Sequence, residues 1–280
     1  MSAKLCVLGG AGTIGRAIVA GILERSLLQP GDMVVTARHE KTLSNVEHLG
    51  VATSLDNAGA IAGADTVVLA VHPDQALNLC RTHRASFRPG ALLISIVTGV
   101  SIDELRDAVG AGVNVVRAMP NIAAVVGAST TSVSLGQGVP DDQVLWVRAI
   151  FDSVGTTVTV DERLMDACTG LGGCGPAFAF KVIESLATGG VKMGLPRDVA
   201  RTMAASVLLG AARLVLTSGK HPAELKDDVT TPGGCTIDGI TELEARGLPI
   251  AMIAAVEAST RKAATIKNRS QCTPKGPCVS

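Results

Sequence analysis

The segment that decides the fold reads Lys4-Leu5-Cys6-Val7-Leu8-Gly9-Gly10-Ala11-Gly12-Thr13-Ile14-Gly15. Its apolar first part predicts a short strand over residues 4–8, and the small and apolar residues 16–24 predict a helix. The pattern Gly10-x-Gly12-x-x-Gly15 therefore joins a strand to a helix, which is the context that a dinucleotide-binding turn needs. In such a turn Gly10 allows the bend, Gly12 lets a pyrophosphate approach the backbone, and Gly15 lets the helix pack on the strand.

Further apolar runs alternate with helical patterns as far as residue 160. They predict strands at residues 33–37, 66–71, 92–97, 113–119, 129–135 and 156–160. Ser101, followed three residues later by Glu104, forms a capping box at the start of one helix. The alternation predicts an α/β fold with a doubly wound parallel sheet of the Rossmann type, whose ligand binds at the carboxyl ends of the strands.

The end of the second strand distinguishes between two nicotinamide cofactors. Chains that bind NAD usually have Asp or Glu there for the ribose 2′-hydroxyl, but this chain reads Thr36-Ala37-Arg38-His39 and has no acid before Glu40. Arg38 is placed to bind a 2′-phosphate, which favours NADPH over NADH. The alternative interpretation of Arg38 is a solvated surface side chain.

After Asp161 the sequence has helical patterns only. They predict helices at residues 163–169, 176–189, 197–217, 223–226, 237–244 and 249–266. Many are rich in alanine on more than one face, as helices buried in a bundle or a dimer are. We therefore expect a Rossmann domain over residues 1–160, an all-α domain over residues 161–266 and a polar tail over residues 267–280.

A loop between two of these helices predicts an anion site. It reads Val229-Thr230-Thr231-Pro232-Gly233-Gly234-Cys235-Thr236-Ile237. The free N–H groups and the positive end of the following helix bind a group such as a carboxylate. Thr231 and Thr236 add hydroxyl groups at the same place. An ordinary helix cap explains these residues as well.

Composition excludes other classes of protein. The 280 residues include 25 basic and 25 acidic side chains, a balance that favours neither nucleic acid nor an anionic membrane surface. Since the chain has 0 Tyr, 1 Trp and 4 Phe, stacking platforms for bases are not expected. The 7 cysteines are dispersed along the chain, which favours reduced thiols over a disulfide framework. Two of them, Cys272 and Cys278, lie in the polar tail. We expect no targeting leader before Lys4, no membrane span and no metal site, and hence a soluble cytoplasmic protein.

Five segments together carry a family resemblance. They are Thr98-Gly99-Val100, Arg117-Ala118-Met119-Pro120-Asn121, Leu171-Gly172-Gly173-Cys174-Gly175-Pro176-Ala177-Phe178, His221-Pro222-Ala223-Glu224-Leu225 and the loop over residues 229–237. In this order they resemble segments of pyrroline-5-carboxylate reductase, the last enzyme of proline synthesis. The resemblance extends over nearly the whole chain, to about Ile266.

The resemblance implies an NADPH-binding Rossmann domain followed by a helical domain that builds an intertwined homodimer, or a larger ring of dimers. Each active site would lie between one subunit's nicotinamide and its partner's Pro-Gly-Gly loop. The implied reaction transfers hydride from NADPH to the C=N carbon of 1-pyrroline-5-carboxylate and forms L-proline. Because a protonated iminium is already electrophilic, the protein mainly positions and stabilises the reactants.

The resemblance also assigns site residues. Thr236 is assigned as the catalytic residue that hydrogen-bonds the ring nitrogen, with a helix-start hydroxyl as its alternative role. The substrate-binding residues are Thr231, Gly233, Gly234, Cys235, Cys174 and Gly175. The cofactor-binding residues are Gly10, Gly12, Thr13, Ile14, Gly15, Arg38, Ala70, His72, Pro73, Thr98, Gly99, Met119, Pro120 and Asn121.

The chain departs from the family pattern at several of these positions. His72 stands where members commonly have Lys, Ile122-Ala123 where they have Thr-Pro, Gly172 and Cys174 where they have Ser, and Cys235 where they have Thr. Two other functions are therefore kept open. One is a β-hydroxyacid-dehydrogenase-like oxidoreductase, for which Lys181 is the nearest acid/base, although Ser185 follows it instead of Asn. The other is a cofactor-binding regulator with lost or altered imine reduction.

Overall fold

The computed structural model describes residues 4–269, which form two compact units. The first unit ends at Cys174 and is joined by the C-terminal part of the chain from Ala258 onward. The second unit is Gly175–Glu257. The predicted boundary between a Rossmann domain and a helical domain at residue 160 stays a prediction. Most of the predicted tail, including Cys272 and Cys278, lies outside the described residues.

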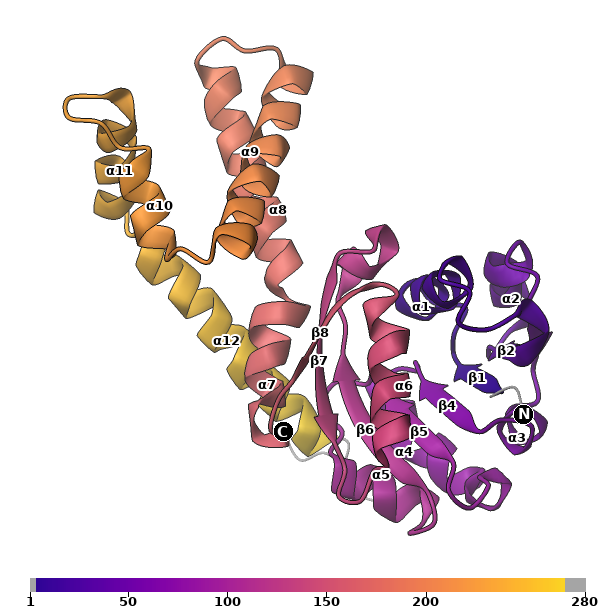
Figure 1. Cartoon of the computed structure of the whole chain (residues 1–280). Helices are drawn as coiled ribbons and strands as arrows, with labels where there is room; N and C mark the ends of the chain where they lie inside the picture. Colours follow the sequence, from indigo (N-terminus) through magenta and orange to yellow (C-terminus); the bar gives the residue numbers. More distant parts are fainter. Residues whose placement is uncertain (1–3, 270–280) are drawn as a thin grey trace, which may run out of the picture. The chain divides into compact units, whose positions relative to one another are not determined.

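Within residues 4–269, the first unit holds an eight-stranded sheet in the order β3-β2-β1-β4-β5-β6-β7-β8 (Figure 1). The strands are β1 (Leu5–Leu8), β2 (Met33–Thr36), β3 (Ala52–Ser54), β4 (Thr66–Leu69), β5 (Leu92–Ser95), β6 (Asn114–Met119), β7 (Ser129–Leu135) and β8 (Gly155–Thr159). The order reverses between β1 and β4, the switch point at which such sheets bind their ligand.

One strand pair corrects the predicted sheet. Neighbouring strands are parallel except β6 and β7, which are antiparallel, so the described sheet is mixed. The reason is the short connection, which holds only the 3-10 helix η3 (Ile122–Val126). A parallel crossover needs a dozen or more residues. The Rossmann-type α/β fold is otherwise confirmed.

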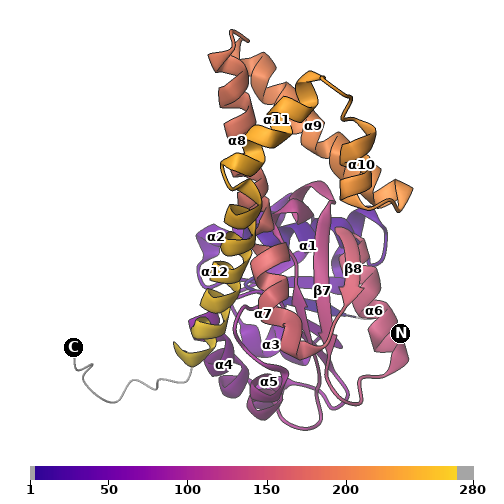
Figure 2. The same cartoon turned by 90° about the vertical axis from the view of Figure 1, so that its left-hand side faces the viewer.

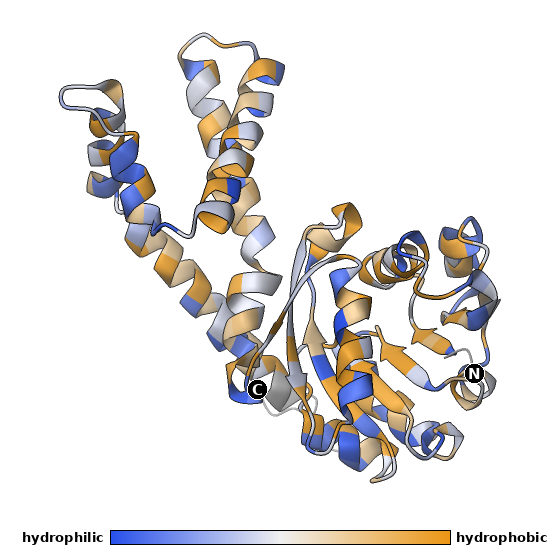
Figure 3. Cartoon of the chain, in the orientation of Figure 1, coloured by the Kyte–Doolittle hydropathy of each residue, from blue (hydrophilic) through white to orange (hydrophobic). Residues whose placement is uncertain are grey.

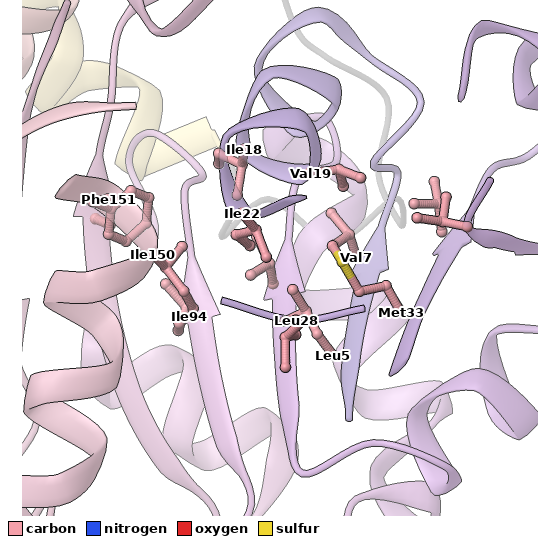
Figure 4. Close-up of a cluster of buried hydrophobic side chains, with 14 of the residues drawn as sticks. Leu5, Val7, Ile18, Val19, Ile22, Leu28, Met33, Ile94, Ile150 and Phe151 are labelled. Atoms are coloured by element: carbon pink, nitrogen blue, oxygen red, sulfur yellow. The ribbon is translucent and has the colours of Figure 1, made fainter. Parts of the chain in front are cut away.

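Helices cover both faces of the sheet. The helices α1 (Thr13–Glu24), α2 (Glu40–Glu47) and α6 (Asp141–Asp152) bury apolar residues on one face, and α3 (Asn57–Ala62), α4 (Pro73–Thr82) and α5 (Ile102–Val109) on the other. Figure 4 shows the first of these layers, with Ile18, Val19 and Ile22 of α1 in the same cluster as Val7 of β1. Strands buried on both faces are nearly continuous apolar runs, which is why the sequence predicts them well.

Short helices connect these elements. They are the 3-10 helices η1 (Pro30–Asp32), η2 (Arg84–Ser86) and η4 (Glu162–Leu164), the α-helical turn α7 (Met165–Cys168) and the π-helical turn η5 (Thr169–Gly173). The predicted capping box of α5 is present, because Ser101 Oγ accepts the Glu104 N–H at 3.3 Å and Glu104 Oε2 accepts the Ser101 N–H at 2.8 Å.

Residues 175–257 contain helices and loops but no strand, as the sequence predicts. The helices α8 (Gly175–Lys192) and α9 (Arg197–Ser218) pack side by side as a hairpin (Figure 2). They are followed by α10 (Pro222–Asp228), α11 (Cys235–Ala245) and α12 (Leu248–Arg269), of which α12 continues into the first unit. The bounds of these five helices differ from the predicted ones by at most three residues.

The helix α9 contains many hydrophobic residues (Figure 3), and most of its apolar side chains are exposed. Val207 is 60% exposed, Leu214 56% and Leu216 83%. By length and composition alone the helix could also cross a bilayer, although the sequence leads us to expect no membrane span. An exposed apolar surface of this kind calls for a partner, either a protein or a lipid phase.

Candidate active site

The turn between β1 and α1 depends on glycines at positions that tolerate no side chain. Gly9 has a φ of +71°, in the left-handed region that favours glycine. A Cβ atom on Gly9 would lie 2.6 Å from the Ala70 carbonyl oxygen. Gly10 does not adopt a left-handed φ; it donates its N–H to the Val7 carbonyl at 3.2 Å, and a Cβ atom there would overlap the Val7 side chain. The left-handed residue of the bend is therefore Gly9, which lies outside the Gly-x-Gly-x-x-Gly pattern.

Gly12 and Gly15 have different surroundings. A Cβ atom on Gly15 would lie 2.6 Å from Gly10 Cα, so glycine at this position lets α1 pack on the turn. At Gly12, which is exposed, the nearest atom to such a Cβ would be the Gly9 oxygen at 3.6 Å. Gly12 also caps α1 without a side chain, which leaves the first-turn N–H groups of Thr13 and Ile14 at the positive helix end. Open backbone next to free N–H groups is suited to a phosphate.

A groove of about 920 Å³ runs along α4 and reaches the carboxyl ends of four neighbouring strands. It is lined by Gly9 after β1, Arg38 after β2, Leu55 after β3 and Val71 after β4. Asn57, at the start of α3, also lines it. Leu55 and Asn57 were not predicted as site residues, because β3 has only 3 residues and no apolar run that would indicate a strand.

Arg38 lies at this groove with an exposed side chain. Among residues 4–269, no carboxylate lies within 4.0 Å of its guanidinium nitrogens. The guanidinium is therefore available for an external anion, and an arginine can bind a phosphate through two parallel hydrogen bonds.

The loop after β4 carries three of the predicted cofactor-binding residues. The Ala70 N–H donates to the Leu8 carbonyl at 2.9 Å, which joins this loop to β1. Pro73 begins α4. His72 Nδ1 lies 2.7 Å from Asp74 Oδ1, and the two side chains are 77% and 71% exposed. Such an exposed pair adds little stability, but it orients the imidazole at the first turn of α4.

The ends of β5 and β6 bring together the remaining cofactor-binding candidates. Thr98 Oγ1 lies 3.9 Å from Met119 Sδ, and Gly99 has a φ of +77°. Pro120 follows β6 and is buried. Asn121 uses both ends of its side-chain amide within the chain, since Nδ2 donates to the Gly172 carbonyl at 3.0 Å and Oδ1 accepts the Ala123 N–H at 2.9 Å.

The carbonyl that Asn121 binds belongs to the π-helical turn η5. In this turn the Cys174 N–H donates to the Thr169 carbonyl at 2.9 Å, and the Thr169 hydroxyl donates to the Met165 carbonyl at 2.8 Å. Turns of this kind are rare and occur frequently at functional sites. The turn was not predicted from the sequence, which indicates a helix over residues 163–169 only.

The second unit contains the Pro-Gly-Gly loop. The Gly234 N–H donates to the Thr231 carbonyl at 3.0 Å, and Gly233 has a φ of +68°. With Pro232 as the second residue and a left-handed glycine as the third, this is a type II turn. Gly234 then caps α11, which begins at Cys235, two residues earlier than predicted.

Thr236 lies in the first turn of α11 and is half-buried. Gly234, not Thr236, is the residue that caps the helix. Among residues 4–269, the Thr236 hydroxyl has no hydrogen-bond partner. The Pro-Gly-Gly loop therefore offers first-turn N–H groups and a free hydroxyl to an external ligand.

Gly175, another predicted substrate-binding residue, begins α8 in the same unit, and a Cβ atom there would contact nothing within 4 Å.

The cysteines differ in reactivity. Burial raises the pKa of Cys6 and of Cys80 from 9.0 to about 12. Both thiols are therefore protonated at neutral pH and act as small apolar side chains. Cys168 and Cys174 are half-buried, and Cys235 is exposed.

Two family models match the chain. The model of pyrroline-5-carboxylate reductase dimerisation matches residues 162–266, and the model of an NADP oxidoreductase, coenzyme F420-dependent, matches residues 4–99. A pyrroline-5-carboxylate reductase of Methanosarcina acetivorans is 40% identical over 254 residues, which cover 90% of this chain and 94% of the relative. This chain belongs to the pyrroline-5-carboxylate reductase family.

Solved pyrroline-5-carboxylate reductases have the same fold. The protein of Coxiella burnetii has a TM-score of 0.87 and 31% identity, covering 95% of this chain and 99% of its own. The protein of Plasmodium falciparum, solved with NADP bound, has a TM-score of 0.86 and 29% identity, covering 95% and 98%. The predicted resemblance to the pyrroline-5-carboxylate reductase family is thus confirmed.

Proposed function

We propose that this chain catalyses the NADPH-dependent reduction of 1-pyrroline-5-carboxylate to L-proline. The observation that carries the proposal is family membership over 90% of the chain. The glycine turn and the groove at the carboxyl edge of the sheet agree with it, because they match the chemistry of a dinucleotide.

The residues at this edge fit NADPH. Gly12 leaves its backbone open, and the first turn of α1 presents free N–H groups for the pyrophosphate. Arg38 supplies a charge-matched contact for the 2′-phosphate, which supports NADPH over NADH. The ends of β4 and β5, with Met119 and Pro120 at the end of β6, supply other predicted contacts, among them His72 in place of the family's Lys.

NADPH, when bound, supplies the hydride that reduces the imine carbon. The chain's own part is to bind and orient the substrate. The first-turn N–H groups of α11, beginning at Cys235, hold the substrate carboxylate at the positive helix end. Thr231, Gly233 and Gly234 shape that turn, and the Thr236 hydroxyl hydrogen-bonds the ring nitrogen.

The assembly that we propose is a cytoplasmic homodimer, or a ring of such dimers. The apolar surface of α9 supports it, because a second copy would cover side chains such as Leu216. Arg201 and Arg213 lie within α9, and charges inside a bilayer span are costly, which favours a protein partner over a membrane. Light scattering at micromolar protein, without detergent, should give a dimer or a multiple of it. An active monomer would contradict the assembly.

The alternative hydroxyacid dehydrogenase would need Lys181 as its acid/base. In the structure the Lys181 ammonium donates to Glu184 at 2.7 Å and is 76% exposed, as expected of an ordinary surface ion pair. This arrangement disfavours that chemistry.

One experiment distinguishes the proposed reaction from its rivals. Purified protein is mixed with NADPH and 1-pyrroline-5-carboxylate, proline is quantified by mass spectrometry, and NADPH binding is titrated on the same sample. Proline formed in equal amount to the NADPH consumed supports the reductase. Tight NADPH binding without proline indicates a regulator, and oxidation of 3-hydroxy acids with NADP⁺ indicates the dehydrogenase.

A further inference from the structure

Three side chains of β6 and the residues after it point toward one later segment of the chain. They are Arg117, Met119 and Asn121, at alternate positions that share one side of an extended chain. Arg117 is 5% exposed and lies between Ser95 of β5 and Ser134 of β7 in the sheet. These neighbouring serines are small, which leaves room on this face for a guanidinium.

Each of the three side chains contacts residues 162–173. Arg117 Nη1 donates to Glu162 Oε1 at 2.8 Å. A Cβ atom on Gly173 would lie 3.8 Å from Met119 Sδ, which places the sulfur against the π-helical turn. Asn121 Nδ2 donates to the Gly172 carbonyl at 3.0 Å. The strand β6 and Asn121, two residues after its end, thus hold both ends of the segment that leads from the sheet to Cys174.

The contact at Glu162 is also tied to α5. Glu162 Oε1 accepts the Ile102 N–H at 2.7 Å in addition to the Arg117 guanidinium. The Arg117 side chain is 6% exposed and that of Glu162 32%. An arginine buried to this degree needs its carboxylate partner, so the pair fixes the start of the segment firmly.

We propose that Arg117 and Asn121 are positioning residues for the reduction. They hold the π-helical turn Thr169–Gly173, and with it Cys174, in register with the carboxyl end of β6. The proposal rests on the proposed function, because the family resemblance assigns Cys174 to the residues that bind the substrate. It also gives the Asn121 amide a different role from the predicted cofactor contact.

The turn needs such support for a physical reason. Residues 169–173 include three glycines, which lose more conformational freedom on ordering than other residues. A π-helical turn contains one residue more than an α-helical turn, and relaxing it to an α-helix would rotate the whole following segment about the helix axis by roughly 100°, the angle of one residue. Cys174 would then point in another direction.

Asn121→Asp tests the proposal, because it keeps the Oδ1 acceptor and the side-chain size but removes the Nδ2 donor. Asn114→Asp is the matched control, since Asn114 begins β6, the strand that precedes Asn121, and donates through Nδ2 to Gln143 Oε1 at 2.9 Å. We expect N121D to lower kcat/KM for the imine by roughly tenfold or more, the effect of a misplacement of about 1 Å. Its NADPH Kd should stay within about twofold of wild type. N114D should leave both quantities within about twofold.

Hydrogen–deuterium exchange provides a second readout that needs no turnover. In N121D the peptide containing residues 169–174 should exchange at least about fivefold faster, and in N114D it should not. This measurement separates the proposal from the proposed function: wild-type protein without turnover would refute the reductase, while unchanged exchange in N121D would refute the positioning role. If N121D raised the NADPH Kd by the same factor by which it lowered kcat/KM, Asn121 would be a cofactor contact. That result would also overturn the proposal.

Arg117 is tested by a pair of substitutions in case N121D folds poorly. Arg117→Lys keeps the charge next to Glu162, and Arg117→Met keeps only the length. We expect R117K to retain more of kcat/KM and of the protection at residues 169–174 than R117M, with NADPH Kd unchanged in both. If both lose thermal stability but keep wild-type kcat/KM and exchange, Arg117 is only a structural residue.

Discussion

The open backbone at Gly12 allows cofactor binding to be separated from folding. In Gly12→Ser, the new Cβ atom would meet nothing closer than the Gly9 oxygen at 3.6 Å, so the turn accommodates it. Serine is a better N-cap than glycine by a few tenths of a kcal/mol, so the melting temperature should stay the same or rise slightly. The side chain nevertheless occupies the place where a phosphate would approach the backbone.

The expected loss of affinity follows from the same geometry. A bond of about 1.5 Å to the new Cβ atom moves the phosphate away from the first-turn N–H groups of α1. A hydrogen bond to a charged group contributes about 1.5–3 kcal/mol, so the loss of one raises the NADPH Kd by roughly 10- to 100-fold. Fluorescence titration gives Kd, and a thermal melt of the same sample gives Tm.

Two other glycines serve as controls for this substitution. Gly31→Ser lies at the amino end of β2, where a Cβ atom meets nothing within 4 Å, and should change neither Kd nor Tm. Gly15→Ala should lower Tm, because its Cβ atom would lie 2.6 Å from Gly10 Cα and overpacking costs about 1–3 kcal/mol. If G12S binds NADPH like wild type, or melts as early as G15A, the assignment of Gly12 to the phosphate is wrong.

Three further predictions concern single side chains. Arg38→Ala should weaken NADPH binding by roughly tenfold or more and leave NADH nearly unchanged; equal losses in the two titrations would show that Arg38 does not bind the 2′-phosphate. Thr236→Ala should lower kcat/KM by roughly 10- to 100-fold with NADPH Kd and Tm unchanged, while Thr236→Ser keeps most activity; equal activity of the two variants would remove Thr236 from the site. Burial raises the pKa of the Cys6 and Cys80 thiols from 9.0 to about 12, so both remain protonated at pH 8. The stability that their burial contributes is complete below pH 9 and is lost progressively as the pH rises toward 12, because the unfolded chain ionises these thiols first. Peptide mapping after thiol labelling at pH 8 should therefore find exposed Cys235 modified and Cys6 and Cys80 intact; early labelling of either buried thiol in folded protein would contradict their burial.

The fold could be predicted from the sequence wherever burial leaves a periodic pattern. The strands β1, β4 and β5 are buried on both faces and appear as apolar runs. The direction of β7 could not be predicted in this way, because side-chain alternation is the same in parallel and antiparallel strands. Only the length of the connection after β6 contains that information.

The site could be predicted in part. The glycine pattern and Arg38 follow from local chemistry, but Asn57 is visible only once β3 is placed beside β2. Ala70, about sixty residues away in the chain, approaches Gly9 so closely that a Cβ atom there would collide with it. The π-helical turn likewise depends on the tertiary contact from Asn121 to Gly172. Such features arise from long-range packing, which no local pattern encodes.

In the proposed reaction, hydride passes from the nicotinamide to the imine carbon within this protein. The most direct measurement uses NADPH that carries deuterium at both C4 positions, with 1-pyrroline-5-carboxylate as the substrate, and mass spectrometry of the proline formed. We expect one deuterium per proline, located at C5, and no deuterium at C5 when the label is supplied as heavy water instead. Proline without deuterium at C5, or no proline from protein that binds NADPH tightly, would contradict the proposed reaction.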